Sequence, residues 1–363
     1  MKRFSLTSGC RRELWPACLA VLAVLTVPAV PMLVATAAQA DGPVIHYTGD
    51  GSDLQKVLDS APAGATVVCD SKTQLVLRFT LVVAKPITLR GLNARLPNEL
   101  GQTSLVAVEA AGVAITDLEL HGNYDSVSQD VRAPLITIHA GGFRLERCKF
   151  YDSSKDGVEV VPKRDAGDIV GGVIKDIEAF RIGRDAVSIT GGNRGQRARD
   201  LTVENVSLKR GYLRGAVEVS DGTDNIAVRN VYAEQCVYAI DVQDHGKGSA
   251  PNTNIAIENV EAVQCKHIIR TANRPLGHAG LTLRNFTGRE CDYPVQISNT
   301  NDVIIDDLKI LGHKSEKFPP IGLNNCQGVT LKNVTVQSSH FADNPVRAKD
   351  CSDLRAEGMG LHE

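Results

Sequence analysis

The chain has 363 residues, and its 40 Lys and Arg residues nearly balance 42 Asp and Glu residues, for a formal net charge of −2. A near-neutral chain without a basic stripe excludes the electrostatic footprint of nucleic-acid-binding proteins. The apolar run that could cross a membrane lies within the first 40 residues, so no membrane contact is expected from the rest. The length fits two ordinary domains or one array of repeats, and no sequence feature sets an oligomeric state.

Residues 1–40 have the organisation of a secretory signal peptide. A basic leader precedes an apolar run over residues 14–35, and the segment ends in Ala38-Gln39-Ala40, a small-x-small cleavage site. We expect cleavage after Ala40 and a secreted or periplasmic protein of residues 41–363, with an uncleaved anchor as the alternative. The pair Arg11-Arg12 leaves twin-arginine export open beside the general route.

Residues 52–62, SDLQKVLDSAP, predict a short helix. Leu54, Val57 and Leu58 share one helical face, and Ser52 can serve as the N-cap. Such a helix would cover the open end of the first coil of a repeat array, where unpaired strand edge would otherwise invite aggregation.

A strand motif then returns at intervals of 23–30 residues. Three upstream segments match the segments between the copies less cleanly: 85–92, 112–122 and 142–150. The copies are DGVEV (156–160), DAVSI (185–189), GAVEV (215–219), YAIDV (238–242), HIIRT (267–271), YPVQI (293–297), PPIGL (319–323) and NPVRA (344–348). Short period-two strands without a helix in each repeat predict an all-β solenoid, a single-stranded right-handed parallel β-helix spanning residues 41–363 with the short N-terminal capping helix.

Each segment between copies carries one polar residue at a fixed place. These residues should stack in one column, buried and hydrogen-bonded: Asn205, Asn230, Asn259, Asn285, Asp307 and Asn333. Turned inward, they would make poor glycosylation sites despite the sequons at three of them. Cys236, Cys265 and Cys291 follow six residues later and should be small buried side chains, with a disulfide between neighbouring coils as the lesser alternative.

The chain resembles the pectin-lyase-like right-handed parallel β-helix superfamily. The segments "SDLQKVLDSAPAGATVV", "KPITLRGL", "DLELHGNYDS" and "IAIENVEAVQC" carry the resemblance, which covers about residues 44–355. It implies the fold, and an exported protein of a group that includes polysaccharide lyases, glycosidases, epimerases, tailspikes, adhesins and catalytically silent members.

The polygalacturonase pattern N-T-D-G, D-D, G-H-G, R-I-K is only partly present. Asp156 and Asp185 keep one acid in each of the first two motifs. Gly215 stands at the histidine place, and Asp241 and Gln243 stand at the Arg and Lys places. The substrate-binding charge is therefore inverted relative to a true polygalacturonase, and the two aspartates could equally be turn residues.

In every copy the residue between two inward apolar side chains points outward. The outward column reads Thr137, Glu159, Ser188, Glu218, Asp241, Arg270, Gln296, Gly322 and Arg347. Because coils stack at about 4.8 Å, neighbouring members should face each other. The predicted catalytic residues are Glu159, Glu218, Asp241, Arg270, Asp156, Asp185 and His245, and the predicted substrate-binding residues are Arg274, Lys163, Arg184 and Lys247.

Two reactions on an acidic polysaccharide fit this set. In β-elimination or epimerisation of a uronate, Lys163, His245 or Lys247 would be the base, and a cation would neutralise the sugar carboxylate. That cation would be an arginine, with no cofactor, or Ca²⁺ held by Glu218 and Asp241. In glycoside hydrolysis, two carboxylates of the column would suffice.

The remaining alternative is a non-catalytic exported β-helix that binds glycan or has a structural or adhesive role. The chain has 7 Tyr and 8 Phe, and its single Trp lies in the leader, which is sparse for a sugar-binding groove. A polar outer face of a sheet also needs no functional explanation.

Overall fold

The computed structural model describes residues 42–69, 72, 74–97, 103–124, 133–192, 195–245, 249–272, 277–338, 340–341 and 343–362. The predicted signal peptide and two predicted substrate-binding residues, Lys247 and Arg274, lie outside the described residues. Within them, no helix has both the length and the hydropathy needed to cross a membrane.

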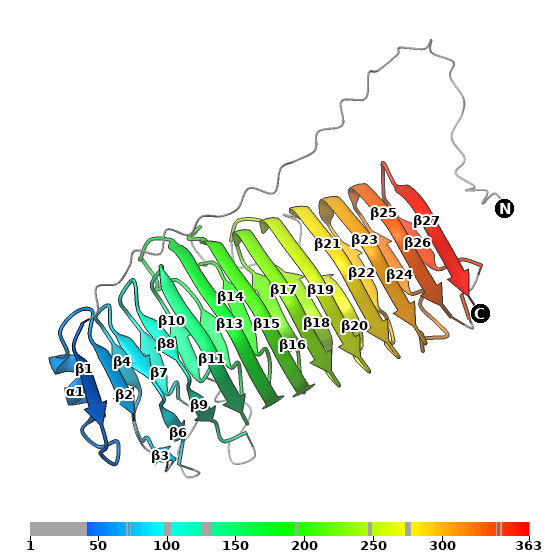
Figure 1. The fold of residues 1–363 in the computed structure, drawn as a ribbon. Helices are drawn as coiled ribbons and strands as arrows, with labels where there is room; N and C mark the ends of the chain where they lie inside the picture. Colours follow the sequence, from blue (N-terminus) through cyan, green and yellow to red (C-terminus); the bar gives the residue numbers. More distant parts are fainter. Residues whose placement is uncertain are drawn as a thin grey trace. The chain divides into compact units, whose positions relative to one another are not determined.

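The described residues form two parallel sheets that run side by side along a solenoid (Figure 1). Among them, sixteen strands form the larger sheet: β1 (Val44–Tyr47), β2 (Thr66–Cys69), β3 (Leu75–Val76), β5 (Thr88–Arg90), β6 (Asn93–Arg95), β8 (Ala114–Thr116), β9 (Glu119–His121), β11 (Phe143–Tyr151), β13 (Ile169–Ile182), β15 (Ala198–Gly211), β17 (Asp224–Glu234), β19 (Thr253–Val263), β21 (His278–Arg289), β23 (Thr300–Leu311), β25 (Gln327–Gln337) and β27 (Arg355–His362).

The smaller sheet receives one strand from each coil, so the described solenoid has about 11 turns. Its eleven described strands are β4 (Leu81–Val83), β7 (Val106–Val108), β10 (Ile136–Ile138), β12 (Val158–Val160), β14 (Val187–Thr190), β16 (Gly215–Ser220), β18 (Tyr238–Gln243), β20 (His267–Ala272), β22 (Val295–Ser298), β24 (Ile321–Asn324) and β26 (Val346–Lys349). The all-β parallel solenoid is confirmed, and the strands of this sheet from β12 to β26 coincide with the eight copies of the returning motif.

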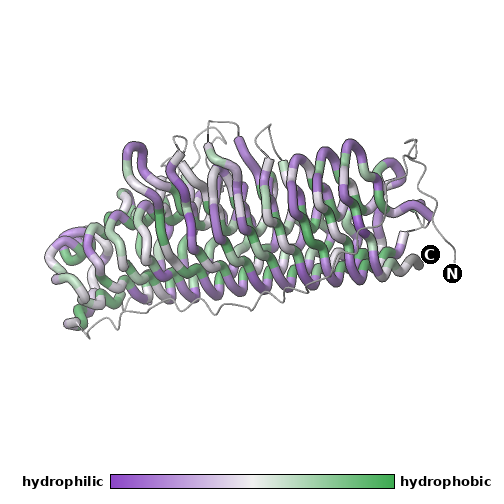
Figure 2. The backbone as a smooth tube through the Cα atoms, turned by 90° about the horizontal axis from the view of Figure 1, so that it is seen from above, coloured by the Kyte–Doolittle hydropathy of each residue, from purple (hydrophilic) through white to green (hydrophobic). Residues whose placement is uncertain are grey.

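The core lies between the sheets and is filled by the inward apolar residues of each strand. In β16, for example, Val217 and Val219 are both 0% exposed, and Ile240 and Val242 continue the same two columns on β18. Figure 2 shows apolar stretches repeating along the solenoid, with hydrophilic segments between them. Because each coil covers the apolar surface of its neighbours, the array forms one continuous core.

The asparagine column forms, but on the outside of the molecule. Asn230 donates from Nδ2 to Asn205 Oδ1 at 2.9 Å, and Asn259 and Asn285 extend the column by the same bond at 2.9 and 2.8 Å. Asn230, Asn259 and Asn285 are exposed, so the prediction that they are buried is wrong. The reason is their backbone: each has φ between 54° and 58°, in the left-handed region that Asn tolerates well. A residue in that conformation bends the strand and turns its side chain outward.

We expect Asn259→Ala to lower the free energy of unfolding by about 1–2 kcal/mol, because alanine pays the left-handed backbone penalty and loses two amide bonds. Asn259→Gly loses the same bonds but accepts φ 58° freely, so it should destabilise by clearly less. Equilibrium denaturant unfolding of both variants tests this. If both variants lost the same free energy of unfolding, the left-handed backbone conformation of Asn259 would not contribute to the cost of the alanine substitution.

The predicted helix is present as α1 (Leu54–Ser60), with Leu54 and Leu58 buried. Gln55 hydrogen-bonds the backbone of Val82 in both directions, at 2.8 Å and 3.1 Å, so the helix contacts β4, the edge strand of the smaller sheet. Closure of the solenoid end by this helix stays a prediction. The N-cap prediction is wrong: Asp53, not Ser52, occupies that position, and its carboxylate accepts from Tyr47 Oη at 2.8 Å instead of capping the helix.

Three of the described cysteines lie in the core as thiols that form no disulfide. Cys236, Cys265 and Cys291 are 6%, 2% and 1% exposed and act as small core side chains, as predicted. Burial raises the pKa of the Cys291 thiol to about 12.

Candidate functional site

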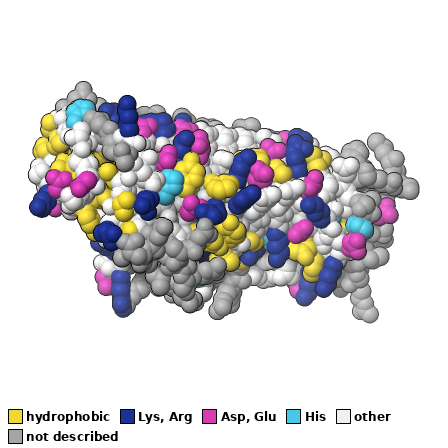
Figure 3. All heavy atoms as spheres, turned by 90° about the horizontal axis from the view of Figure 1, so that it is seen from below, with side chains coloured by type: hydrophobic (Ala, Val, Ile, Leu, Met, Phe, Trp, Pro, Cys, Tyr) yellow, Lys and Arg dark blue, Asp and Glu magenta, His cyan; other side chains and the backbone are white. Residues whose placement is uncertain are grey.

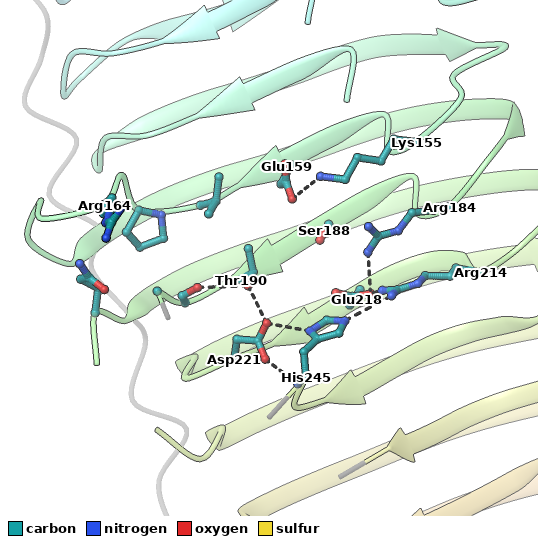
Figure 4. A pocket seen from close by; sticks show the side chains of 15 residues that line it. Lys155, Glu159, Arg164, Arg184, Ser188, Thr190, Arg214, Glu218, Asp221 and His245 are labelled. Atoms are coloured by element: carbon teal, nitrogen blue, oxygen red, sulfur yellow. Dashed lines mark hydrogen bonds and ion pairs between the residues drawn. The ribbon is translucent and has the colours of Figure 1, made fainter. Parts of the chain in front are cut away.

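A row of cations precedes three consecutive strands of the smaller sheet. Lys155, Arg184 and Arg214 occupy the same turn position before β12, β14 and β16, one coil apart. In Figure 4 their side chains lie beside the outward residues Glu159 and Glu218, which come from the strands themselves. The three cations form one row and the outward strand residues form another, because equivalent residues of successive coils stack on each other. The two rows are neighbours because each cation lies only a few residues before its strand.

These residues line a cavity of about 580 Å³ on the outer face of the smaller sheet. Its charged and titratable lining consists of Lys155, Glu159, Arg164, Arg184, Arg214, Glu218, Asp221 and His245. Four cations thus face three carboxylates, a lining that suits an anionic ligand. On the face seen in Figure 3, basic and acidic side chains are likewise interspersed rather than segregated.

Glu218 lies at the base of this cavity and is 1% exposed. Arg214 forms an ion pair with its carboxylate, Gln243 donates to Oε2 at 2.6 Å, and Ser220 donates to Oε1 at 2.9 Å. Arg184 approaches the same carboxylate at 3.8 Å. Ionised carboxylates accept hydrogen bonds only, so this shell of donors holds Glu218 in its charged form.

His245 and Asp221 form a dyad at the cavity wall. His245 Nδ1 lies 2.7 Å from Asp221 Oδ2, and the backbone N of His245 donates to Asp221 Oδ1 at 2.8 Å. The other ring nitrogen, Nε2, lies 3.2 Å from Arg214 Nη2. Because a guanidinium only donates, Nε2 is the acceptor and the proton of a neutral ring sits on Nδ1. The dyad therefore presents the lone pair of Nε2 next to a cation (Figure 4).

Asp156 and Asp185 lie beneath the cavity rather than in its wall. Both are 0% exposed. Asp156 Oδ1 accepts from the backbone N of Asp185 at 3.1 Å, and Asp185 Oδ1 accepts from Tyr238 Oη at 2.9 Å and from Gly215 N at 3.3 Å. Burial raises the pKa of both carboxyl groups, and with the nearby Asp156 charge it raises that of Asp185 to about 7. These bonds to turn backbone fit the turn-residue interpretation.

Stability should depend on pH through Asp185. Its folded pKa of about 7 lies above the ordinary value of an aspartate, 3.8, so the folded state binds the proton more tightly than the unfolded chain does. The stabilisation is complete below the unfolded pKa and is lost as pH rises through 7. We expect about 2 kcal/mol of unfolding free energy to disappear between pH 5 and pH 8. In denaturant titrations at several pH values, Asp185→Asn should reduce the dependence of the unfolding free energy on pH. The exposed-site control Asp343→Asn should leave that dependence unchanged. If Asp185→Asn left it unchanged as well, Asp185 would not be its source.

Asp241 and Arg270 form a separate pair one coil beyond Glu218. Arg270 Nε donates to Asp241 Oδ1 at 3.1 Å and Nη2 pairs with Oδ2, while the guanidinium carbon lies 5.1 Å from the centre of the Tyr238 ring. Burial is the largest influence on Asp241 and raises its pKa, against the lowering effect of Arg270. The pKa of Asp241 is therefore not raised by Glu218, as the predicted carboxylate pair would require. Glu218 is paired with Arg214, and Asp241 is paired with Arg270.

The same pairing does not fit a calcium site. Calcium needs six to eight oxygen ligands, and the oxygens of Glu218 and Asp241 are already taken by guanidinium and amide donors. The part of the chain that is described holds no cluster of three His, Cys, Asp or Glu residues suited to a metal.

The outward column matches its predicted register at every step, from Thr137 opposite Glu159 to Gly322 opposite Arg347. Of the predicted site residues, the cavity brings together Glu159, Arg184, Glu218 and His245. Lys163 is not among its lining and pairs with Glu109 instead.

Sequence reasoning missed Lys155, Arg214 and Asp221. The signal for the first two was present, because both occupy the turn position at which Arg184 had been noticed. Asp221 lies in the loop "SDGTD", and nothing local distinguishes it from Asp224 in the same loop. Only the next coil, which carries His245, identifies it.

Comparison with known proteins gives structural matches alone. The sequence matches no family model and no curated protein sequence. Among solved structures, it is similar to a Yersinia enterocolitica family 28 exopolygalacturonase, with 13% identity, a TM-score of 0.57, and coverage of 89% of this chain and 79% of that chain. The A-module of an Azotobacter vinelandii mannuronan C-5 epimerase matches at 12% identity and a TM-score of 0.52, covering 85% and 93%.

A third match is the N-terminal fragment of bacteriophage Phi29 gene product 12, with 14% identity, a TM-score of 0.52, and coverage of 86% and 69%. At these identities the likeness concerns the fold. The chain therefore shares its parallel β-helix fold with these proteins.

Proposed function

We propose that this protein is an exported enzyme that acts on a uronate-containing polysaccharide in the cavity on the smaller sheet. The single observation that carries the proposal is the His245–Asp221 dyad, whose Nε2 lone pair lies 3.2 Å from the Arg214 guanidinium. A base beside a carboxylate-binding cation is what proton removal next to a sugar carboxylate requires. Two proteins of the same fold, an exopolygalacturonase and a mannuronan epimerase, support the choice of substrate class.

The proposed reaction is β-elimination or epimerisation at C5 of a uronate. The substrate carboxylate takes the Arg214 guanidinium, which frees His245 Nε2 to remove the C5 proton. The electron pair of the C–H bond moves toward the carboxylate carbon, and Arg214 with Arg184 stabilises the developing charge. In elimination the C4–O bond then breaks and the departing oxygen takes the proton that His245 had removed; in epimerisation a water molecule donates a proton to C5 from the opposite face, and His245 releases its proton to solvent.

Hydrolysis is less well supported by the same geometry. It needs one carboxyl group in its protonated form and one ionised. Glu218 is held ionised by its donors, and Glu159 Oε1 lies 2.6 Å from Lys155 Nζ. Asp185 has a raised pKa, but it is buried below the cavity floor.

Non-catalytic glycan binding is the second candidate. It is favoured by the way the cavity charges pair with one another, Lys155 with Glu159 and Arg214 with Glu218, which would also stabilise a purely structural face.

The test is incubation of the purified protein with polygalacturonate and with alginate, each with added calcium and with a chelator. Ultraviolet absorbance detects unsaturated uronates, a reducing-end assay detects any cleavage, and NMR in D₂O detects deuterium at C5. Unsaturated product or deuterium uptake is expected. New reducing ends without unsaturation would replace the proposal with hydrolysis, and binding without any chemical change would leave the non-catalytic candidate. The mass of protein recovered from the exported fraction tests cleavage after Ala40.

A further inference from the structure

Two aromatic side chains and two lysines gather at the turns before β20, β22 and β24, beyond the cavity along the solenoid. Tyr293 and Phe318 pack edge to face, with ring centres 4.9 Å apart and planes at 83°. Lys266 Nζ lies 5.5 Å from the centre of the Tyr293 ring, and Lys317 Nζ lies 5.4 Å from that of Phe318. We call these four residues the aromatic platform. It contains two of the few aromatic residues of the chain.

The platform faces water. Phe318 is 37% exposed, Tyr293 is half-buried, and both lysines are exposed. Among the described residues, neither Lys266 nor Lys317 forms an ion pair, although Asp292 and Glu316 lie next to them at the same turns. Exposed apolar rings that are flanked by lysines suit a ligand with apolar faces and negative charge.

The platform shares its turn row with the cavity. Backbone bonds lead from Arg214 to Val237, from Val237 to His267, and from Lys266 to Tyr293, so Tyr293 lies three coils beyond Arg214. That corresponds to about 14 Å along the solenoid axis. Between the two lies Arg270, which stacks on Tyr238 and keeps 31% of its side chain exposed. Arg270, which is paired with Asp241, is thus a partly exposed cation between the cavity and the platform.

We propose that the platform is a remote binding subsite for the same polyuronate chain, which would lie along the solenoid axis from the cavity toward β24. This inference rests on the proposed function. The C–H face of a sugar ring packs on Tyr293 or Phe318, and Lys266 and Lys317 attract the carboxylates of that part of the chain. The platform thereby favours long chains over short ones, because only a long chain reaches both places.

The experiment compares uronate oligosaccharides of increasing length, prepared from polygalacturonate and from alginate, by calorimetric affinity and by kcat/KM. In the wild type, affinity should rise once the chain spans both places. The double variant Tyr293→Ala/Phe318→Ala should reduce the ratio of long-chain to short-chain affinity by about fivefold to tenfold. Lys266→Gln/Lys317→Gln should weaken the salt dependence of long-chain binding.

Phe180→Ala is the matched control. Phe180 is also 37% exposed and also carries a cation, Arg210, at 5.4 Å from its ring centre, but it belongs to β13 of the larger sheet. It should leave the ratio unchanged. The subsite would be overturned if the Tyr293/Phe318 variant kept the wild-type ratio of long-chain to short-chain affinity, or lost affinity equally for short and long chains. Turnover of polyuronate by the wild type would uphold the proposed function in either case. A wild type that binds no uronate of any length would sink both.

Discussion

Replacing His245 with Gln should lower the turnover of the identified polyuronate by about 10²–10⁴-fold, the usual contribution of a positioned general base. Glutamine keeps a polar side chain of similar reach, but its amide has no basic lone pair comparable to that of imidazole Nε2. The effect should fall on kcat rather than on KM, because the substrate carboxylate is bound by Arg214 and Arg184, which the substitution leaves in place. Single-turnover kinetics of the wild type and variant would measure it.

Two variants sharpen this test. Asp221→Asn keeps the shape of the dyad but removes the charge that holds the imidazole tautomer, so it should also lower kcat. His139→Gln is the matched control and should leave kcat unchanged. His139 is half-buried directly after β10 of the smaller sheet, its Nδ1 lies 2.8 Å from the Val161 carbonyl oxygen, and it does not line the cavity. Full activity in His245→Gln would remove the dyad from the mechanism.

The register of the solenoid could be predicted from the sequence because two constraints act together. Alternation of apolar and polar residues fixes which side chains face the core, and parallel stacking forces equivalent residues of successive coils into line. The alignment of Glu159, Ser188 and Glu218 follows from these constraints alone, and the structure reproduces it.

The bends of the larger sheet were less well predicted. In β17 the buried residues are Ile226, Val228, Val231 and Ala233, so the period of two breaks at Arg229 and Asn230. The sequence "IAVRNVYA" contains two consecutive polar residues. The strand bends at these residues, and the bend turns the Asn230 side chain outward. A strict alternation had placed it inside.

The cavity itself depended on information that no single repeat contains. Whether an outward carboxylate is solvated or covered is decided by side chains of neighbouring coils, here Arg184 and Arg214 over Glu218. Long side chains that begin at a turn can lie back over a sheet, and their direction is not encoded in their position along the repeat. The sequence therefore left open whether the column is an exposed polar face or lines a groove; Glu218 and Asp241 prove to be buried.

Replacing Arg214 with Met should lower the free energy of unfolding by about 3–5 kcal/mol, because it leaves buried carboxylates without their cation. Arg214 pairs with Glu218 and lies 3.6 Å from Asp185 Oδ2, and both acids are at most 1% exposed. Methionine retains most of the side-chain volume, so lost charge rather than lost packing dominates. Equilibrium denaturant unfolding near pH 7 measures the change.

A second substitution separates the charge effect from any general damage at this position. Adding Glu218→Gln to Arg214→Met removes the uncompensated charge while Ser220 and Gln243 remain as hydrogen-bonding partners, so the double variant should be more stable than Arg214→Met alone. Arg284→Met serves as the control, since its pair with Glu258 at 3.7 Å is at the surface and contributes within about 1 kcal/mol. If Arg214→Met were no worse than Arg284→Met, the acids beneath the cavity would not need this cation, and Arg214 would be free to serve the substrate alone. The expected large loss instead means that Arg214 has two roles, holding Glu218 ionised in the empty cavity and turning to the substrate carboxylate when one arrives.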